Sequence, residues 1–95
     1  MENKYCIVRC NQAGVFTGIV KERHGREVTL TDCRRVWYWE GAASISQLAV
    51  DGTKRPENCK FTVAVEEIIL LDAIEIIPCT KEAEVSIREV PTWKI

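Results

Sequence analysis

Short runs in which hydrophobic and polar residues alternate occupy most of the first 40 positions of the chain. This alternation predicts four consecutive β-strands, at residues 5–10, 15–20, 27–31 and 33–39. Turn-forming residues separate the first three strands, and Asp32 separates the last two. Consecutive short strands with tight turns favour a strongly twisted antiparallel sheet or a small partly open barrel.

Glycines mark two special positions in this pattern. Gly18 lies inside the second predicted strand, where it indicates a bulge or a close approach of two backbones. Gly41 ends the strand pattern. The next residues, 42–50, have helical spacing, with Ser44 as a candidate N-cap and Gly52 as a candidate C-cap. This helix is expected to be only about two turns long.

The remainder of the chain returns to strands and closes with a helix. Residues 60–65 and 68–77 predict strands, and residues 80–90 predict the final helix before Pro91. One face of that helix would carry Ala83, Ile87 and Val90. The pattern therefore predicts one α+β domain over residues 1–95, mostly antiparallel β, with a short central helix and a C-terminal helix.

Composition and charge narrow the function classes. The chain has 95 residues, of which 46% are hydrophobic and 28% charged, the balance of an ordinary globular domain. Its longest unbroken apolar run, residues 68–71, is too short for a membrane span, and residues 1–4 open no secretory signal, so we expect a cytoplasmic protein. Residues 1–60 hold ten Lys/Arg and seven Asp/Glu, whereas residues 61–95 hold three and seven, for a net charge of −1. Such a chain is not a generally basic nucleic-acid binder, and any anion must meet a local cluster.

The sequence carries no motif for catalysis, metal binding or a cofactor. It lacks a nucleophile elbow, a phosphate-binding glycine loop and a C-x-x-C pair, and its single histidine, His24, lies in a predicted turn between two arginines. We therefore expect a protein that is not an enzyme and holds neither metal nor cofactor. Reduced thiols that pack as small hydrophobic groups are expected at Cys6, Cys10, Cys33, Cys59 and Cys79.

Residues 33–39 concentrate the side chains that could bind a ligand, with three aromatic rings and two guanidinium groups in seven positions. In a strand, alternation would place Arg35, Trp37 and Trp39 on one face. The opposite face would carry Arg34, Val36 and Tyr38. Guanidinium groups beside indoles suit a nucleotide, because arginine holds a phosphate and the ring stacks on a base. The alternative is that one face is core and the indoles only pack.

The segment that follows adds small and polar residues at the start of the predicted central helix. Small residues there would let a phosphate approach the backbone N–H groups, while hydroxyl and amide groups would contact sugar and base edges. The alternative is an ordinary helix cap with solvated polar residues. The candidate ligand contacts from this region and the next loop are Gly41, Ala42, Ser44, Ser46, Gln47 and Asn58.

Residues 34–49 (R-R-V-W-Y-W-E-G-A-A-S-I-S-Q-L-A) and 56–61 (P-E-N-C-K-F) resemble a family of short phage and prophage proteins, the Thoeris anti-defence sponges, which sequester immune nucleotide signals. The resemblance extends from about Tyr5 to Trp93. It implies a homo-oligomer, a hexamer built from dimers, that acts in the cytoplasm of an infected bacterium against Thoeris and CBASS signalling. It further implies binding of glycocyclic ADP-ribose at dimer interfaces and of cyclic di- or trinucleotides in separate pockets, with release of the ligand unaltered. Arg88 is the candidate for a C-terminal ligand arginine.

Two other classes of function fit the same residues. A small β-rich module could bind single-stranded RNA or DNA through the aromatic and arginine side chains, although such grooves usually carry more Lys and Arg. A protein-interaction module that inhibits a host protein could use Trp and Arg as interface anchors. Binding that grows with oligonucleotide length would distinguish the first, and a stoichiometric protein partner the second.

Overall fold

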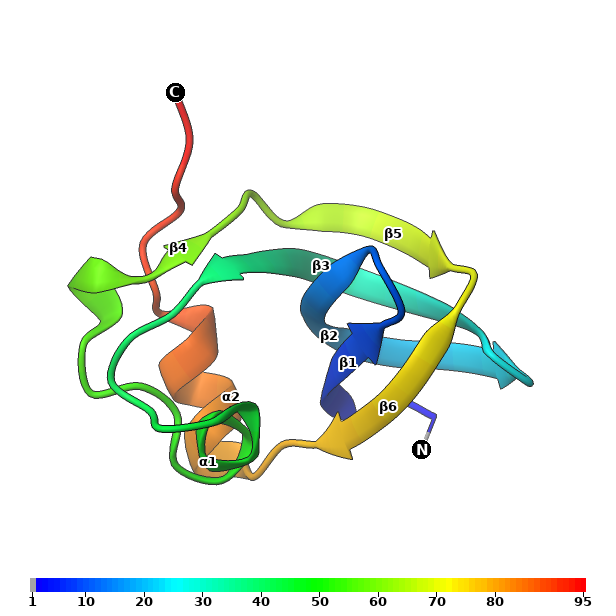
Figure 1. Ribbon diagram of the computed structural model, residues 1–95, viewed down its shortest axis with the longest axis horizontal. Coiled ribbons are helices and arrows are strands. Elements are labelled where there is room, and N and C mark those ends of the chain that lie inside the picture. Colours follow the sequence, from blue (N-terminus) through cyan, green and yellow to red (C-terminus); the bar gives the residue numbers. More distant parts are fainter. Residues whose placement is uncertain (1) are drawn as a thin grey trace.

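A computed structural model describes residues 2–95. These residues form six strands, two α-helices and one 3-10 turn (Figure 1). In chain order these elements are β1 (Tyr5–Cys10), β2 (Gly14–His24), β3 (Glu27–Tyr38), α1 (Ile45–Asp51), the 3-10 turn η1 (Pro56–Asn58), β4 (Lys60–Phe61), β5 (Val65–Leu70), β6 (Ala73–Pro78) and α2 (Lys81–Arg88). The predicted α+β class with a short central helix and a C-terminal helix is confirmed.

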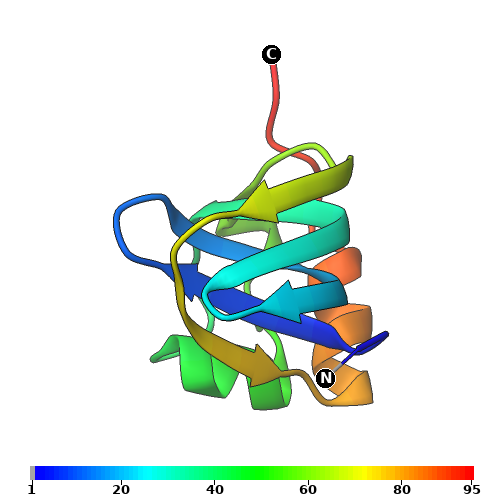
Figure 2. The same cartoon turned by 90° about the vertical axis from the view of Figure 1, so that its right-hand side faces the viewer.

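The six strands form one open sheet in which every strand pairing is antiparallel. The order is β4-β3-β2-β1-β6. β4 pairs with the end of β3, and β5 pairs with the first part of β3 at the same edge. β5 and β6 lie at the two edges of the sheet. The sheet curls strongly, and a short connection joins these two strands (Figure 2). The backbone N–H of Ala73 donates to the carbonyl of Arg26 at 2.9 Å, which ties this connection to the β2–β3 turn.

β3 is one long bent strand, whereas the sequence pattern predicted two strands separated at Asp32. Asp32 has φ 52°, and opposite it the register of β2 and β3 shifts between Thr17 and Ile19. The residue therefore forms a bulge that bends the strand without ending it. A Cβ on Gly18 would lie 3.0 Å from the Thr31 carbonyl oxygen, so the close backbone approach predicted there is confirmed.

The strand prediction for residues 60–65 and 68–77 is also wrong in its boundaries. Strand β4 is only two residues long, β5 begins at Val65, and the chain turns at Leu71 and Asp72 before β6. No glycine or proline marks this turn, and apolar residues flank it on both sides, so the sequence pattern runs through it.

Two hydrophobic clusters lie on opposite faces of the curled sheet. The concave face encloses one cluster, built around Val8, Phe16 and Leu30, and the helices cover the other, built around Ile7, Leu48 and Phe61. Four of the five cysteines are buried as free thiols, and burial raises the pKa of Cys33 to about 12. These thiols act as small core groups.

Both helices begin at side-chain caps. Ser44 caps α1 and Thr80 caps α2, and Gly52 follows α1 at a positive φ of 75°. A Cβ on Gly52 would lie 2.4 Å from the Ser86 side chain, so glycine lets the end of α1 contact α2. The predicted apolar face of α2 is confirmed at Ala83 and Ile87, but the helix ends at Arg88 and not at residue 90, so Val90 is buried in the segment that follows it. No helix in residues 2–95 is long and apolar enough to cross a membrane.

Candidate functional site

The aromatic and arginine segment lies in the second half of β3, where buried and exposed side chains alternate. Arg34 and Val36 are buried on the helix-covered face, whereas Arg35 and Trp37 are exposed on the other. The alternation predicted from the sequence therefore holds as far as Trp37.

Arg34 is part of the framework. Its side chain is 6% exposed, and its guanidinium donates to four backbone carbonyls: those of Thr62 at 2.9 Å, Ile87 at 3.0 Å, Phe61 at 3.2 Å and Pro91 at 3.3 Å. Burial lowers the pKa of Arg34. These carbonyls supply the negative partial charge that a buried cation requires, and the one from Ile87 lies at the C-terminal end of α2, where the helix dipole is also favourable. Arg34 thus joins β3 to the chain around α2 and is not available at the surface for a ligand.

The predicted face-sharing of Arg35, Trp37 and Trp39 is wrong for Trp39. The register of β3 and β4 shifts between Val36 and Tyr38, and the strand ends at Tyr38. Trp39 therefore turns toward the helix-covered cluster, where its indole Nε1 donates to the Ala42 carbonyl at 3.0 Å. Tyr38 is exposed instead of sharing the buried face of Val36.

Trp37 forms a surface with two residues that the sequence analysis did not select. Its ring is 65% exposed and stacks on Trp93, with centroids 6.0 Å apart and planes at 18°. The ammonium of Lys60 lies 5.4 Å from the centroid of Trp93. We call Trp37, Trp93 and Lys60 the aromatic surface.

The C-terminal segment reaches this surface by pairing with β4. Thr92 forms a parallel bridge with Phe61, and the backbone N–H of Trp93 donates to the Phe61 carbonyl at 2.9 Å. The sequence signal was a large aromatic residue in a polar tail after Pro91, but the pattern gave no sign that the tail returns to the sheet.

A polar network borders Tyr38. Its hydroxyl donates to one carboxylate oxygen of Glu40 at 2.7 Å, and the Asn58 amide donates to the other oxygen at 3.2 Å. The Arg55 guanidinium lies 3.8 Å from that second oxygen. The hydrogen bond to Glu40 raises the pKa of Tyr38, and the bonds from Tyr38 and Asn58 lower the pKa of Glu40. Asn58 is exposed, but its side-chain amide is held by the Glu40 carboxylate.

Arg35 lines a groove of about 560 Å³ between the β1–β2 loop and the β5–β6 connection. Its guanidinium lies 4.6 Å from the Phe16 ring centroid, and Nη1 donates to the Ala13 carbonyl at 3.0 Å. The other guanidinium N–H groups form no hydrogen bond within residues 2–95 and remain available to an anion. The residues that line this groove, called the Arg35 groove below, are Cys10, Asn11, Gln12, Ala13, Phe16, Arg35 and residues 68–72.

The start of α1 has the geometry of an ordinary helix cap. The Ser44 hydroxyl accepts the Gln47 N–H at 3.1 Å, and the Gln47 side-chain oxygen accepts the Ala43 N–H at 2.7 Å. These bonds satisfy N–H groups that a phosphate would otherwise contact, as in a capping box. Ser46 is exposed on the first turn.

Gly41 and Ala42 are packed against the protein. Gly41 has φ 88°, and a Cβ there would lie 2.4 Å from the Thr53 hydroxyl and 2.5 Å from the Arg55 nitrogen. Ala42 packs against the helix-covered cluster. Both positions serve the turn that leads from β3 into α1.

Arg88 lies in the last turn of α2, on the helix-covered side of the sheet. Nε donates to Glu84 at 2.9 Å, Nη1 donates to Asp32, and the guanidinium lies 4.7 Å from the Tyr5 ring centroid. Burial would lower the pKa of Arg88, but the hydrogen bonds to Asp32 and Glu84 outweigh it and raise the pKa. The carboxylates of Asp32 and Glu84 therefore already neutralise the Arg88 guanidinium.

His24 and the acidic residues do not assemble a metal centre. His24 lies at the end of β2 with Nε2 3.3 Å from the Glu22 carboxylate. Within residues 2–95 no three side chains from His, Cys, Asp and Glu come together in a way that could hold a metal ion.

The fold and the surface define a small α+β protein whose curled sheet displays exposed aromatic and cationic side chains beside a groove. The chain belongs to the family described as a domain of unknown function (DUF6948), whose model matches residues 3–87. No curated protein and no solved structure matches the chain.

Proposed function

We propose that this protein is a non-catalytic binder of nucleotide signal molecules, which it sequesters without cleaving them. The observation that carries the proposal is the stacked, exposed pair of Trp37 and Trp93 with the Lys60 ammonium beside it. A ligand base can stack on such an indole surface, and a phosphate can meet the adjacent cation.

Exposure separates this pair from ordinary core tryptophans. Trp37 is 65% and Trp93 45% exposed, so a large part of each residue remains open to a ligand. Stacking of a base on an exposed aromatic ring contributes about 1–3 kcal/mol per base. The two indoles thus supply the apolar part of the binding energy for a nucleotide.

Cations near the indoles supply the electrostatic part of the binding energy for a nucleotide. Arg35 and Trp37 are two residues apart and both exposed, and Arg35 keeps guanidinium donors available in the Arg35 groove. Arginine binds phosphate oxygens bidentately, and lysine binds them as a point charge. We assign the phosphates to Arg35 and Lys60, with Tyr38 and Asn58 at the border, and we leave Arg34 in a structural role.

The identity of the signal follows from the resemblance of residues 34–49 to the anti-defence sponges. The ligands proposed on this ground are glycocyclic ADP-ribose and cyclic di- or trinucleotides, bound in the cytoplasm of an infected bacterium. Stacking rings and cations are suited to hold such molecules intact, because neither group is an activated nucleophile.

A sponge of this kind gains from association of protomers, because two surfaces can enclose a small anion. β5 pairs only with β3 within residues 2–95, and it exposes Val65, Ile69 and Leu71 along or next to its free edge. These apolar side chains and the opposite charges of the two parts of the chain support a homo-oligomer built from dimers.

Release of bound ligand by heat tests the proposal. Purified protein is incubated with glycocyclic ADP-ribose isomers and cyclic oligonucleotides, separated from free ligand, and denatured, and the supernatant is analysed by mass spectrometry. We expect intact ligand only after heating. Product in the supernatant would indicate an enzyme. If no small ligand is retained, the proposal is wrong. Binding to single-stranded oligonucleotides that strengthens with length would then assign the aromatic surface to nucleic acid, and a stoichiometric protein partner would assign it to protein.

A further inference from the structure

We propose a second binding site, for a small organic carboxylate, in a pocket between the tip of the β2–β3 hairpin and β6. The pocket has a volume of about 430 Å³, within the range of about 300–1,000 Å³ typical of small-molecule sites. We call it the hairpin pocket. It is lined by Arg23, Gly25, Arg26, Val28 and residues 73–76. The inference concerns none of the residues of the aromatic surface and is independent of the proposed function.

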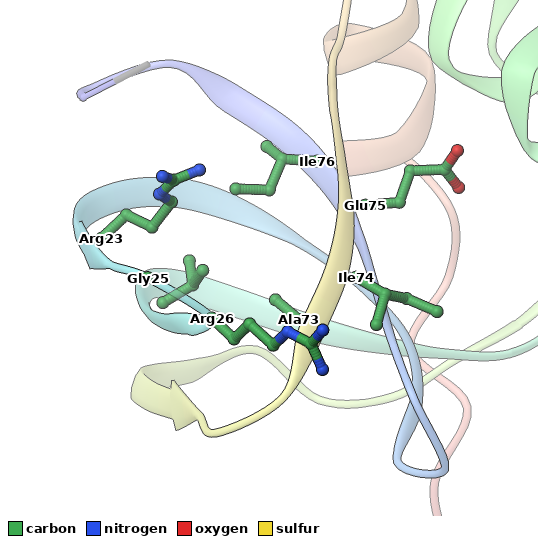
Figure 3. A pocket seen from close by; sticks show the side chains of 8 residues that line it. Arg23, Gly25, Arg26, Ala73, Ile74, Glu75 and Ile76 are labelled. Carbon is green, nitrogen blue, oxygen red and sulfur yellow. The ribbon is translucent and has the colours of Figure 1, made fainter.

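Two guanidinium groups from the hairpin tip line this pocket. Arg23 pairs in register with Val28, which is fully buried in the concave cluster, so the Arg23 side chain projects from the concave face at the end of the hairpin. Arg26 follows Gly25, which adopts φ 61° in the turn. Figure 3 shows both arginine side chains reaching from the hairpin and Ile76 pointing toward it from β6.

The charges of the pocket favour a ligand with one negative charge. Arg23 forms no salt bridge with any carboxylate in residues 2–95, whereas Arg26 lies 3.3 Å from Asp72. Glu75, the one acidic residue of the lining, is bound to Arg9 at 3.0 Å, and its carboxylate points away from the hairpin (Figure 3). Two guanidiniums and one carboxylate line the pocket, so it holds one positive charge in excess, and Arg23 carries it.

The rest of the lining sets the nature of the ligand body. On β6, Ala73 and the half-buried Ile76, which packs against the concave cluster, give the pocket one aliphatic wall, while Val28 is fully buried and offers a ligand no surface. An arginine over an aliphatic wall recognises a carboxylate attached to an apolar body, because the head pairs with the guanidinium while the body leaves water. We therefore assign the pocket to a monocarboxylate with a compact ring or branched chain.

Benzoate is the probe of choice, because it carries one charge on a compact apolar ring. Amide shifts in ¹H–¹⁵N spectra locate the binding, and calorimetry measures its affinity. Benzoate is expected to shift residues 23–28 and 73–76, while benzamide, its neutral counterpart, binds at least about tenfold more weakly because it lacks the charge-assisted bond. Arg23→Gln is expected to weaken benzoate binding by about the same factor. Arg55→Gln, which removes an equal charge outside the pocket, is expected to leave it unchanged.

Three results would overturn the assignment. They are an absence of shifts at the hairpin pocket with millimolar benzoate, equal benzoate affinity of Arg23→Gln and the unaltered protein, and tighter binding of phenyl phosphate, a dianion, than of benzoate. The amide spectrum of each variant also reports whether it folds. Retention of benzoate by Trp37→Ala is expected, so failure of this site and failure of the nucleotide surface are distinguishable.

Discussion

Replacing Arg34 by methionine should destabilise the fold far more than the same change at its neighbour Arg35. Methionine keeps an apolar stem of similar length but cannot donate to the carbonyls that the guanidinium binds. Two of those hydrogen bonds, to the carbonyls of Ile87 and Phe61, are buried. The other two acceptors are partly accessible and can turn to water.

The magnitude follows from the two buried acceptors. Both carbonyls keep one backbone donor, the Trp93 N–H for Phe61 and the Val90 N–H for Ile87, so the variant loses two hydrogen bonds from a charged donor. Each such bond contributes about 1.5–3 kcal/mol, or about 3–6 kcal/mol for both. Removing the guanidinium also removes the cost of desolvating it, which offsets part of this loss. We expect a decrease of about 3 kcal/mol in the free energy of unfolding. A domain of this size is stable by roughly 5–14 kcal/mol, so the loss is a large fraction.

Urea unfolding followed by far-ultraviolet circular dichroism measures the effect, and Arg35→Met is the matched control. Arg35 is exposed, and its contact with the Phe16 ring and its bond to the Ala13 carbonyl should together contribute about 1 kcal/mol or less. We expect the urea midpoint of Arg34→Met to lie more than about 1 M below that of Arg35→Met. Equal midpoints for the two variants would refute the structural role assigned to Arg34.

Two further predictions concern the cap of α1 and the Glu40 network. Ser44→Ala removes the hydroxyl that accepts the Gln47 N–H and should lower the free energy of unfolding by about 0.5–2 kcal/mol, as measured by urea unfolding. A loss of nucleotide binding with unchanged stability would instead make Ser44 a ligand contact. Because the bonds from Tyr38 and Asn58 lower the pKa of Glu40 in the folded state, its carboxylate stabilises the fold at neutral pH, and this contribution is lost as the pH falls below its ordinary value of 4.5 and through the lowered pKa. The melting temperature of the unaltered protein should therefore fall toward that of Glu40→Gln on acidification, and a constant difference between pH 7 and pH 3 would contradict the assignment.

Local patterns sufficed to predict most of the fold. Caps at Ser44 and Gly52, the apolar face of α2 and the close approach at Gly18 follow from residue chemistry over a few positions, and the structure confirms them. Several strand boundaries failed because tertiary pairing decided them, among them the end of β2, which continues past the predicted Val20 to His24. β3 continues through the Asp32 bulge, and the turn at residues 71–72 carries no glycine or proline.

The candidate site was less accessible to sequence reasoning, because its composition depends on contacts between distant segments. Alternation correctly placed Arg35 and Trp37 on one face, but it could not show that a bulge after Val36 would turn Trp39 inward. Arg34 and Arg35 look equivalent in the sequence. The carbonyls that hold Arg34 come from the β4 region and from the end of α2 and the chain beyond it, and the return of the chain after α2 also brings Trp93 onto Trp37.

Calorimetric titration of Trp37→Ala with glycocyclic ADP-ribose and cyclic oligonucleotides tests whether the stacked indoles bind a nucleotide. Val85→Ala is the control, because Val85 is an exposed apolar residue on α2. We expect the unaltered protein and Val85→Ala to bind the same nucleotide with equal affinity. Trp37→Ala is expected to bind about 5- to 160-fold more weakly, from the loss of about 1–3 kcal/mol of stacking, with an unchanged melting temperature. Equal affinity of Trp37→Ala and Val85→Ala, or no binding by the unaltered protein, would contradict this expectation.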